Sequence, residues 1–255
     1  MTETHAYLRI ADQLREMIHS GDLTPGDRLP AHRALADEYE VSEILIRRAI
    51  DLLRTEGLVE SRRGSGTFVR ARPAVRRISM DRYRVDAGPQ HEPATSFTAD
   101  QGITWSQYRL DKAFRWVEAT AHLADLFGVE PGVRVLERRF VFYSKGEPSQ
   151  MSRSCLLAAD VEGTPVADPK NEPWPGGNIG QLRTLGIVVD EIVEETAVRM
   201  PTPEEVAMLG IGTGVPVFAI TRQMLAANRV VEVADPITIP GDRAVRVDRI
   251  RPMPE

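Results

Sequence analysis

The stretch from Ser42 to Arg54, SEILIRRAIDLLR, is the feature of this chain that most restricts its fold. Four apolar residues recur at helical spacing and form one face of a predicted helix, namely Ile46, Ala49, Ile50 and Leu53. Ser42 is expected to cap this helix by accepting a backbone N–H of the first turn. The opposite face carries Glu43, Ile44, Arg47, Arg48, Asp51 and Arg54. A helix that is buried on one side and exposes arginines near its start fits the DNA major groove, although most such helices only face water.

The residues before this helix predict two further helices. A first amphipathic helix is marked by Tyr7, Ile10, Ala11, Leu14, Met17 and Ile18, and Ser20-Gly21 ends it. A turn with the sequence LTPGD follows, and a second helix is expected to begin at Pro30, with Leu35 and Ala36 facing inward. Two short helices joined by a tight connection form a helix-turn-helix, whose second helix would start at Ser42.

The residues after Gly57 predict a β-hairpin. Leu58 and Val59 resume an extended apolar pattern, Arg63-Gly64-Ser65-Gly66 forms a glycine-bearing tip, and Thr67 to Val69 returns as a strand. A hairpin that follows a helix-turn-helix is a wing. Arg62 and Arg63 would then reach phosphates or a narrow minor groove, and the glycines would allow close backbone approach to DNA.

The charge distribution favours an anionic partner for the N-terminal part alone. The whole chain carries a formal net charge of −5. Between residues 47 and 77, however, the sequence contains nine arginines and only three acidic residues, which leaves a local excess of six positive charges. Such asymmetry is typical of nucleic-acid binding, and a solvated basic patch is the alternative interpretation.

The rest of the chain predicts a linker and then a second domain of α+β class. Residues 1–72 would form the first domain, residues 73–100, with Pro89 and Pro93, an interdomain linker, and residues 101–255 the second domain. A diverged repeat relates residues 123–153 to residues 206–235, and it aligns Gly132 with Gly214 and Val135 with Val217. Each copy predicts a short helix, a glycine turn and two strands, and paired copies would enclose one cleft.

Residues 7–69 resemble the winged helix of the GntR family of bacterial transcription regulators. The matching pieces are SGDLTPGDRLPAHRALADEYEVS and EGLVESRRGSGTFV, in the same order and spacing. The resemblance implies a homodimer on double-stranded, pseudo-palindromic operator DNA, with contacts from Arg33, Arg47 and the wing around Gly66. Together with the exposed helix and hairpin positions, the predicted DNA-binding residues are Arg33, Ser42, Glu43, Ile44, Arg47, Arg48, Arg62, Arg63, Ser65, Gly66 and Thr67.

Three departures from the family pattern make an operator sequence inferred from relatives unsafe. His32 stands where the family usually has Glu, and Ile44 and Leu45 stand where threonines are common. Glu43 occupies a position that is commonly basic or small and polar. A carboxylate there either accepts from a cytosine amino group or pairs with Arg47 one turn later, and both alternatives are open.

Residues 105–250 resemble the effector-sensing UTRA domain of the HutC branch of the GntR family, which has a chorismate-lyase-like fold. The supporting pieces are LFGVEPGVRVLERRFVFYSKGEPSQ, VEGTPVADP and MPTPEEVAMLGIGTGVPVF. The fold class is therefore expected to be α+β, an N-terminal winged helix-turn-helix followed by a chorismate-lyase-like antiparallel-sheet domain.

The resemblance also indicates which residues face the effector. Sugar-phosphate sensors of this branch carry two arginines before the GEP turn, and Phe140 and Phe142 occupy those positions here. A phosphate would lose its bidentate partners, so a sugar phosphate is not the expected effector. The sugar-binding acid of the following strand is replaced by Ser152, whereas Glu232 in the second copy is retained. Core packing of the two phenylalanines and a surface salt bridge at Glu232 are the alternatives.

The predicted effector-binding residues are Phe140, Phe142, Ser152, Arg153 and Glu232. The expected ligand is uncharged or cationic and partly apolar, with a donor group for Glu232. Because Glu232 and Asp235 lie an odd number of positions apart on one strand, only one of them should line the cleft unless a bulge intervenes.

Other function classes find little support. Cys155 is the only cysteine, which excludes an intramolecular disulfide and a cysteine-rich zinc site, and it is expected to be a buried small hydrophobe. No metal-binding histidine motif, nucleophile elbow or phosphate-binding loop is present, so no metal, cofactor or enzymatic activity is expected. The sequence contains neither a membrane-spanning run nor a secretory signal at its start, which predicts a cytoplasmic protein without a membrane partner.

The leading hypothesis is a transcription regulator, a repressor, that leaves its operator when a small molecule binds the C-terminal domain. The first alternative is a constitutive DNA-binding protein whose C-terminal half only dimerises. The second is an enzyme on the lyase-like fold.

Overall fold

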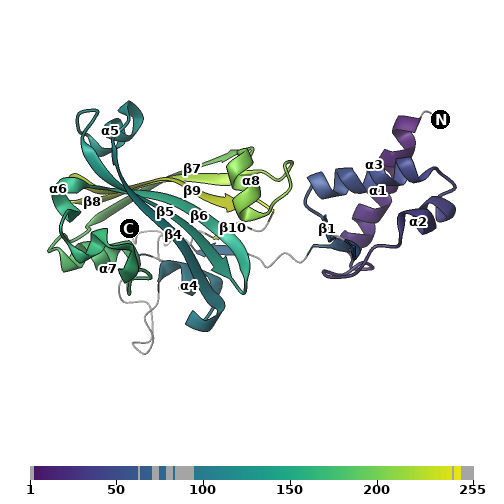
Figure 1. The fold of residues 1–255 in the computed structure, drawn as a ribbon, viewed down its shortest axis with the longest axis horizontal. Helices are drawn as coiled ribbons and strands as arrows, with labels where there is room; N and C mark the ends of the chain where they lie inside the picture. Colours follow the sequence, from purple (N-terminus) through teal and green to yellow (C-terminus); the bar gives the residue numbers. More distant parts are fainter. Residues whose placement is uncertain are drawn as a thin grey trace, which may run out of the picture. The chain divides into compact units, whose positions relative to one another are not determined.

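The computed structural model describes residues 3–62, 64–70, 75–78, 83, 95–242 and 244–247. They fall into two compact units (Figure 1). Unit 1 comprises Met1–Pro73 together with Met200–Pro216, and unit 2 comprises Ala74–Arg199 together with Val217–Glu255. The second unit therefore contains a segment of the chain that the sequence assigned to the linker.

Unit 1 contains the predicted helices and wing. Its elements are α1 (Glu3–Ser20), α2 (His32–Glu38), α3 (Glu43–Thr55), β1 (Val59–Arg62) and β2 (Gly66–Val69). The four apolar residues of the predicted α3 face are all buried, and Ile46 and Leu53 pack in one core with Ile10 and Leu14 of α1. The strands pair antiparallel with Arg62 opposite Gly66. The predicted winged helix-turn-helix is therefore confirmed.

Two local expectations about the helix starts were wrong. The second helix begins at His32 rather than at Pro30, because Ala31 still has extended backbone and acts as its N-cap. Ser42 does hold the N-cap position of α3, but its side chain makes no capping hydrogen bond. Its carbonyl accepts from the amides of Leu45 and Ile46 instead, which is what any N-cap residue supplies.

Residues 200–216 complete unit 1. They contain α8 (Pro203–Leu209), whose start is fixed by a reciprocal capping box between Thr202 and Glu205. The Gly214 amide donates to the Thr55 carbonyl over 3.0 Å and so satisfies one of the last carbonyls of α3.

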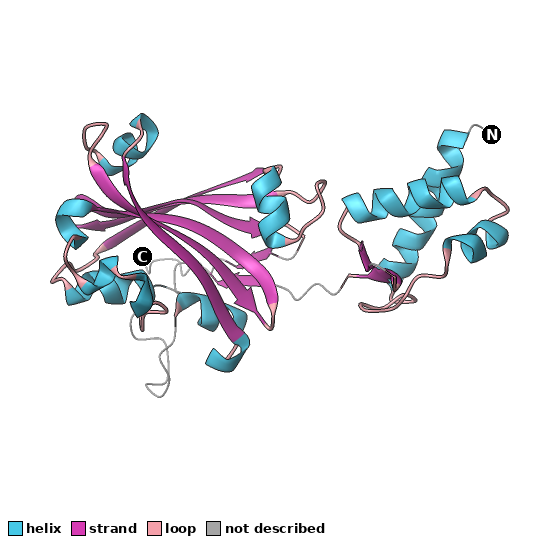
Figure 2. Ribbon diagram, in the orientation of Figure 1, coloured by secondary structure: helices cyan, strands magenta, loops and turns pink. Residues whose placement is uncertain are grey.

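Unit 2 is built on an antiparallel β-sheet, drawn in magenta in Figure 2. Its six strands lie in the order β4-β5-β6-β9-β8-β7. The strands are β4 (Tyr108–Glu118), β5 (Arg134–Ser144), β6 (Glu147–Leu157), β7 (Glu191–Arg199), β8 (Val217–Ala226) and β9 (Arg229–Pro240). The α+β fold class is confirmed. The two repeat copies supply the hairpins β5-β6 and β8-β9, which join through β6 and β9 into a single continuous sheet.

Different helices cover the two faces of this sheet. Helix α5 (Ala121–Phe127) packs on one face with Val135, Cys155 and Val233. The other face, called the α7 face here, packs through Leu136, Leu156 and Met224 against α6 (Ala158–Val161), α7 (Gly177–Thr184) and the short turns Pro165–Ala167 and Pro169–Asn171. Short helical elements Ser96–Gln101 (α4) and Trp105–Gln107 precede β4.

The predicted linker, residues 73–100, contains regular structure. Strand β3 (Val75–Ile78) pairs in parallel with β10 (Ala244–Val247), and α4 begins at Ser96 with a Thr95 cap. A partner that lies far away in sequence explains why local pattern gave no signal for β3. Most of the residues between them lie outside the described residues.

The two isoleucines of α3 provide a matched test of this packing. Ile46 is fully buried, whereas Ile44 is 66% exposed. Ile46→Ala should lower the free energy of unfolding of unit 1 by about 2–5 kcal/mol, because it removes a buried side chain and leaves a cavity. Ile44→Ala should change it by less than about 0.5 kcal/mol. Denaturant unfolding followed by helical circular dichroism measures both, and equal effects would contradict the assigned faces of α3.

Candidate DNA-binding surface and effector site

The exposed face of α3 is formed by the residues that the sequence placed there. Ser42, Glu43, Ile44, Arg47 and Arg48 are all exposed. Ile44 is the most exposed large hydrophobic residue of the described chain. An apolar side chain beside arginines on one helix face can contact a thymine methyl group while the arginines bind guanine edges or phosphates.

Glu43 and Arg47 do not form an ion pair within the described part of the chain; the only such pair on α3 joins Arg54 to Asp51 at 2.8 Å. One of the two alternatives for Glu43, support of the helix through Arg47, is therefore not observed. Both side chains stay available for a partner outside unit 1. Arg33, on α2, is also exposed, whereas His32 beside it is partly buried.

The wing offers a smaller set of side chains than the sequence predicted. Ser65 and Arg62 are exposed at its tip, and Arg62 pairs with Glu60 and lies over the Phe68 ring with its guanidinium 4.6 Å from the centroid. Thr67 is only 9% exposed, so its side chain cannot serve as a DNA contact, contrary to the prediction. Its carbonyl accepts from the Leu29 amide at 2.8 Å, which joins β2 to the segment before α2. Arg63 lies outside the described residues.

Arg28 is a candidate contact that sequence reasoning missed. It forms an isolated bridge with Phe68 of β2, and a Cβ placed on Gly66 would lie 2.8 Å from its Nε. Gly66 also has a φ of +114°, which disfavours any other residue. The glycine therefore accommodates an exposed arginine next to the wing. The backbone pairing of residues 26–29 with β2 brings Arg28 to this place, and no local motif indicates it.

The α7 face of the sheet brings together four of the five predicted effector residues. Phe140 lies opposite Ser152 across the β5-β6 ladder, so their side chains share a face, and Phe142 lies two residues further along β5. Glu232 lies opposite Met224, which packs on the same face.

Arg153 is on the opposite face and is not part of this group. It lies between Ser152 and Ser154 on β6, and its Nε donates to the Asp235 carbonyl over 2.7 Å. Asp235 itself accepts from His122 and Thr221, each at 2.9 Å. The expectation that Glu232 and Asp235 point in opposite directions is confirmed.

Glu232 is completely buried and carries a full set of donors. Its Oε1 accepts from Ser154 Oγ at 2.7 Å and from Asn178 Nδ2 at 2.8 Å. Arg222 binds both carboxylate oxygens, with NH2 at 2.7 Å from Oε1 and Nε at 3.2 Å from Oε2. Burial by itself lowers the pKa of Arg222, but the adjoining Glu232 carboxylate and the Tyr83 hydroxyl raise it above its usual value. The alternative of a surface salt bridge is therefore wrong, because the pair lies inside the domain.

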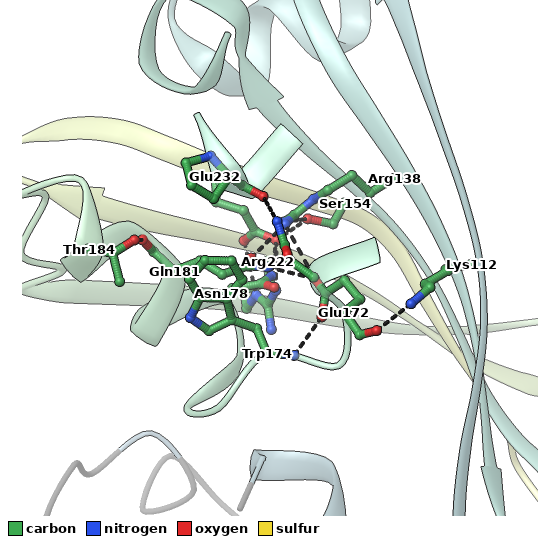
Figure 3. Close-up of polar contacts among 12 residues, drawn as sticks. Lys112, Arg138, Ser154, Glu172, Trp174, Asn178, Gln181, Thr184, Arg222 and Glu232 are labelled. Carbon is green, nitrogen blue, oxygen red and sulfur yellow. Dashed lines mark hydrogen bonds and ion pairs between the residues drawn. The ribbon is translucent and has the colours of Figure 1, made fainter. Parts of the chain in front are cut away.

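A second buried arginine, Arg138, lies beside this pair (Figure 3). Its NH2 donates to Ser154 Oγ at 2.7 Å and its NH1 donates to Gln181 Oε1 at 2.6 Å. Gln181 Nε2 in turn donates to Glu172 Oε1, and Glu172 Oε2 accepts from the Trp174 amide. Burial lowers the pKa of Arg138, since the interior disfavours the charged form, while the Glu232 and Glu172 carboxylates oppose that effect. Ser154 thus joins the two arginine networks.

An aromatic cluster continues along β5 from Arg138. The Phe114 and Phe140 ring centroids are 5.7 Å apart, and those of Phe140 and Phe142 are 5.8 Å apart. Phe97 of α4 contacts Phe142 at 5.1 Å. Phe140 is 5% exposed, so it is a core residue, as the alternative interpretation had it, and it also borders the Arg138 network.

Sequence reasoning missed Arg138, Arg222, Asn178 and Gln181. Strand period could have found Arg138, because it stands two residues before Phe140 and so shares its face. The two amides come from α7, whose place on the sheet no local pattern determines.

Cys155 is buried as expected, and burial raises the pKa of its thiol to about 12. Among the described residues no cluster could hold a metal ion, and no described helix is long and apolar enough to span a membrane.

Comparison with known proteins identifies the family. Residues 6–69 match the model of the bacterial regulatory proteins of the gntR family, and residues 113–244 match the model of the UTRA domain. An uncharacterised HTH-type transcriptional regulator of Streptomyces coelicolor is 33% identical over 211 residues, which cover 80% of this chain and 77% of that protein. The chain belongs to the GntR family of transcription regulators.

Two further relatives extend over most of the chain. The mannosyl-D-glycerate transport/metabolism system repressor of Escherichia coli is 28% identical over 231 residues, covering 89% of this chain and 88% of that protein. The crystal structure of a GntR-family transcriptional regulator is 32% identical with a TM-score of 0.59, and the match covers 97% of this chain and 98% of the other. This GntR protein is thus a DNA-binding transcription regulator with an effector-sensing UTRA domain, and not an enzyme.

Arg47 is the first residue to test on the DNA-binding surface. Arg47→Ala should weaken specific operator binding by about 1–3 kcal/mol, the typical value of a bidentate arginine–guanine contact. The fold should not change, because the side chain is exposed on α3. A titration at fixed salt measures the effect, with Arg134→Ala, an exposed arginine of unit 2, as the control. Unchanged operator affinity would remove Arg47 from the interface.

The wing can be tested through its two positive-φ glycines. Gly66→Val should weaken binding to all DNA sequences alike, since it strains a backbone at φ +114° and displaces Arg28. Gly64→Val is the matched control, because its φ of +74° carries similar strain but a Cβ there meets no atom within 4 Å. Affinities for operator and random duplex distinguish the outcomes. A changed preference at one base pair without general loss would mean that the wing reads bases.

Proposed function

We propose that this regulator is a repressor that binds its operator as a homodimer and leaves it when a small organic molecule binds beside the Arg138–Glu232 network. The observation that supports this most strongly is the combination of an exposed arginine-bearing α3 in a winged unit with a buried charged network in the sheet unit. Relatives that match most of the chain carry the name repressor.

On the DNA side, the proposal assigns base contacts to α3 and backbone contacts to its surroundings. Ser42, Glu43, Ile44, Arg47 and Arg48 would lie in the major groove. Arg33, Arg62, Ser65 and Arg28, with Arg63 at the wing tip, would position the unit on phosphates. A homodimer would present two copies of this surface to half-sites about one helical turn, or a multiple of it, apart.

On the effector side, the proposal excludes a sugar phosphate. Phe140 and Phe142 replace the two arginines that would hold a dianion, and the Glu232 and Glu172 carboxylates lie next to Arg138. A bound molecule would act by favouring a conformation in which the two winged units no longer match the operator. Such a shift can be no larger than the difference in ligand affinity between the two conformations.

A specific observation favours the alternative of a constitutive DNA-binding protein. Every oxygen of Glu232 is already satisfied from within the chain, which is the state expected of a purely structural ion pair. If this alternative holds, no small molecule changes operator affinity, whatever it binds.

One experiment separates the two. Selection of bound duplexes from a random pool should yield a pseudo-palindromic operator, and fluorescence anisotropy of that operator with the full-length chain then reports release by a metabolite library. We expect at least one compound to weaken operator binding tenfold or more. Failure to select any sequence would overturn the DNA-binding proposal, whereas selection without release by any compound would support the constitutive alternative.

Glu232→Gln is a poor probe of this mechanism. Replacing the carboxylate would leave the Arg222 guanidinium buried without its counter-charge, and breaking such a buried pair typically costs about 3–5 kcal/mol. A loss of response in that variant would therefore report unfolding as much as ligand binding.

A further inference from the structure

Two buried arginines on the α7 face, Arg138 and Arg222, differ in their hydrogen-bond partners. Arg138 is fully buried, and Arg222 is 8% exposed. Both contact Ser154 or its partner Glu232, so they lie in the same network (Figure 3). Their side-on edges, formed by Nε and NH2, can be compared directly, because this is the edge with which an arginine binds a carboxylate through two parallel hydrogen bonds.

Arg222 uses this edge in full. Its Nε and NH2 bind the two oxygens of Glu232 at 3.2 and 2.7 Å. On Arg138 the same edge holds only a serine hydroxyl, since NH2 donates to Ser154 Oγ and Nε has no hydrogen-bond partner. A buried N–H without an acceptor in the chain is rare in native proteins, and it indicates a group that is completed by a molecule from outside the chain, either a water or a ligand.

No carboxylate of the described chain completes Arg138. The nearest, Glu172, has its Oε1 4.0 Å from NH1, on the other side of the guanidinium from the open edge. That carboxylate is occupied, because Gln181 Nε2 donates to Oε1 at 2.6 Å and the Trp174 amide donates to Oε2 at 2.9 Å. Arg138 is thus a buried cation whose direct partners are two neutral groups, Ser154 and Gln181.

The surroundings of the open edge are partly apolar. The guanidinium carbon of Arg138 lies 5.6 Å from the Phe140 ring centroid and 5.9 Å from that of Phe114. Ser152, opposite Phe140 on the next strand, is buried and uncharged. A molecule that reaches Nε would therefore meet the aromatic rings of Phe114 and Phe140. The cations beside this region are Arg222, which already holds Glu232, and Lys112, which lies opposite Phe140 on β4.

We propose that Arg138 is the receptor for the carboxylate of the effector, and that the remainder of that effector is apolar. This inference rests on the proposed function and names the ligand class of the same site. A carboxylate supplies the planar, singly charged acceptor that the Nε edge lacks. A phosphate does not fit as well, because its second charge would approach the Glu232 and Glu172 carboxylates, and Lys112, the further cation in this network, already donates to the Glu172 carbonyl.

The proposal replaces the ligand class expected from the sequence. That expectation, an uncharged or cationic ligand with a donor group, treated Glu232 as the residue in need of a partner. The donors to Glu232 are complete, from Ser154, Asn178 and Arg222, whereas the acceptors to Arg138 are not. The group without a partner is therefore the Arg138 Nε–H donor, and the matching group on a ligand is a hydrogen-bond acceptor.

The test uses the full-length chain and three matched classes of probe. Benzoate, 3-phenylpropionate and cyclohexanecarboxylate are compared with their primary amides and with phenyl phosphate, first by thermal shift and then by calorimetry. A ligand that binds only the native state raises its melting temperature. We expect at least one acid to have a dissociation constant at least tenfold lower than that of its own amide and that of phenyl phosphate.

The variants are Arg138→Gln and Arg138→Lys, with Arg139→Gln as the control. Arg139 is the next residue on β5, exposed and on the opposite face of the sheet. Both Arg138 variants should weaken binding of the acid about 10- to 100-fold, since a charge-assisted pair is lost or reduced to a point charge. The control should bind as the wild type does.

A second measurement does not depend on a folded variant. In the wild type, the Arg138 Nε–H resonance, assigned as the signal missing in Arg138→Lys or by through-bond transfer along the side chain, should move downfield on titration with the acid and not with the amide. An amide or phosphate that matches the acid, no binding by any acid, or an unmoved Nε–H signal would each overturn the carboxylate assignment. Operator affinity without ligand is measured in parallel, so that failure here leaves the DNA-binding proposal standing.

Discussion

The burial of Glu232 is the constraint around which the sheet unit is arranged. A carboxylate without solvent contact is tolerated only when it is paired and hydrogen-bonded, and removal of one partner costs far more than the pair contributes. Arg222 on β8, Ser154 on β6 and Asn178 on α7 meet at this one side chain. The centre of the sheet and the helix that covers it are therefore joined by a polar contact that forms only when all three are in place.

The same contact links the two copies of the internal repeat. Ser154 belongs to the first hairpin and Glu232 to the second, and the ladder between β6 and β9 holds them side by side. The register of this ladder shifts between Ser152 and Ser154, where Arg153 Nε donates to the Asp235 carbonyl. A network of this kind favours one arrangement of the sheet over others of similar apolar content, because a half-satisfied network is costly.

In the winged unit the constraint is apolar instead. Helix α3 buries Ile46, Ala49, Ile50 and Leu53 against α1 and the strands, and this fixes the rotation of the helix about its axis. This rotation decides which residues face outward, so the spacing of the apolar residues also places the arginines on the exposed face. The helix that we propose as the DNA-contacting one is therefore positioned by its buried face.

The sequence by itself determined the elements whose signals are local. The spacing of apolar residues in α3, the glycines of the wing and the period of β5 depend on neighbours within a few positions, so they can be read without the fold. Only the tertiary structure decided the rest. The face of Arg153, the burial of Thr67 and the meeting of Arg28 with Gly66 depend on register between distant segments. The same holds for β3, whose partner strand is β10. It also holds for Arg138, because α7 and β6 provide hydrogen-bond acceptors for its NH1 and NH2 but none for its Nε.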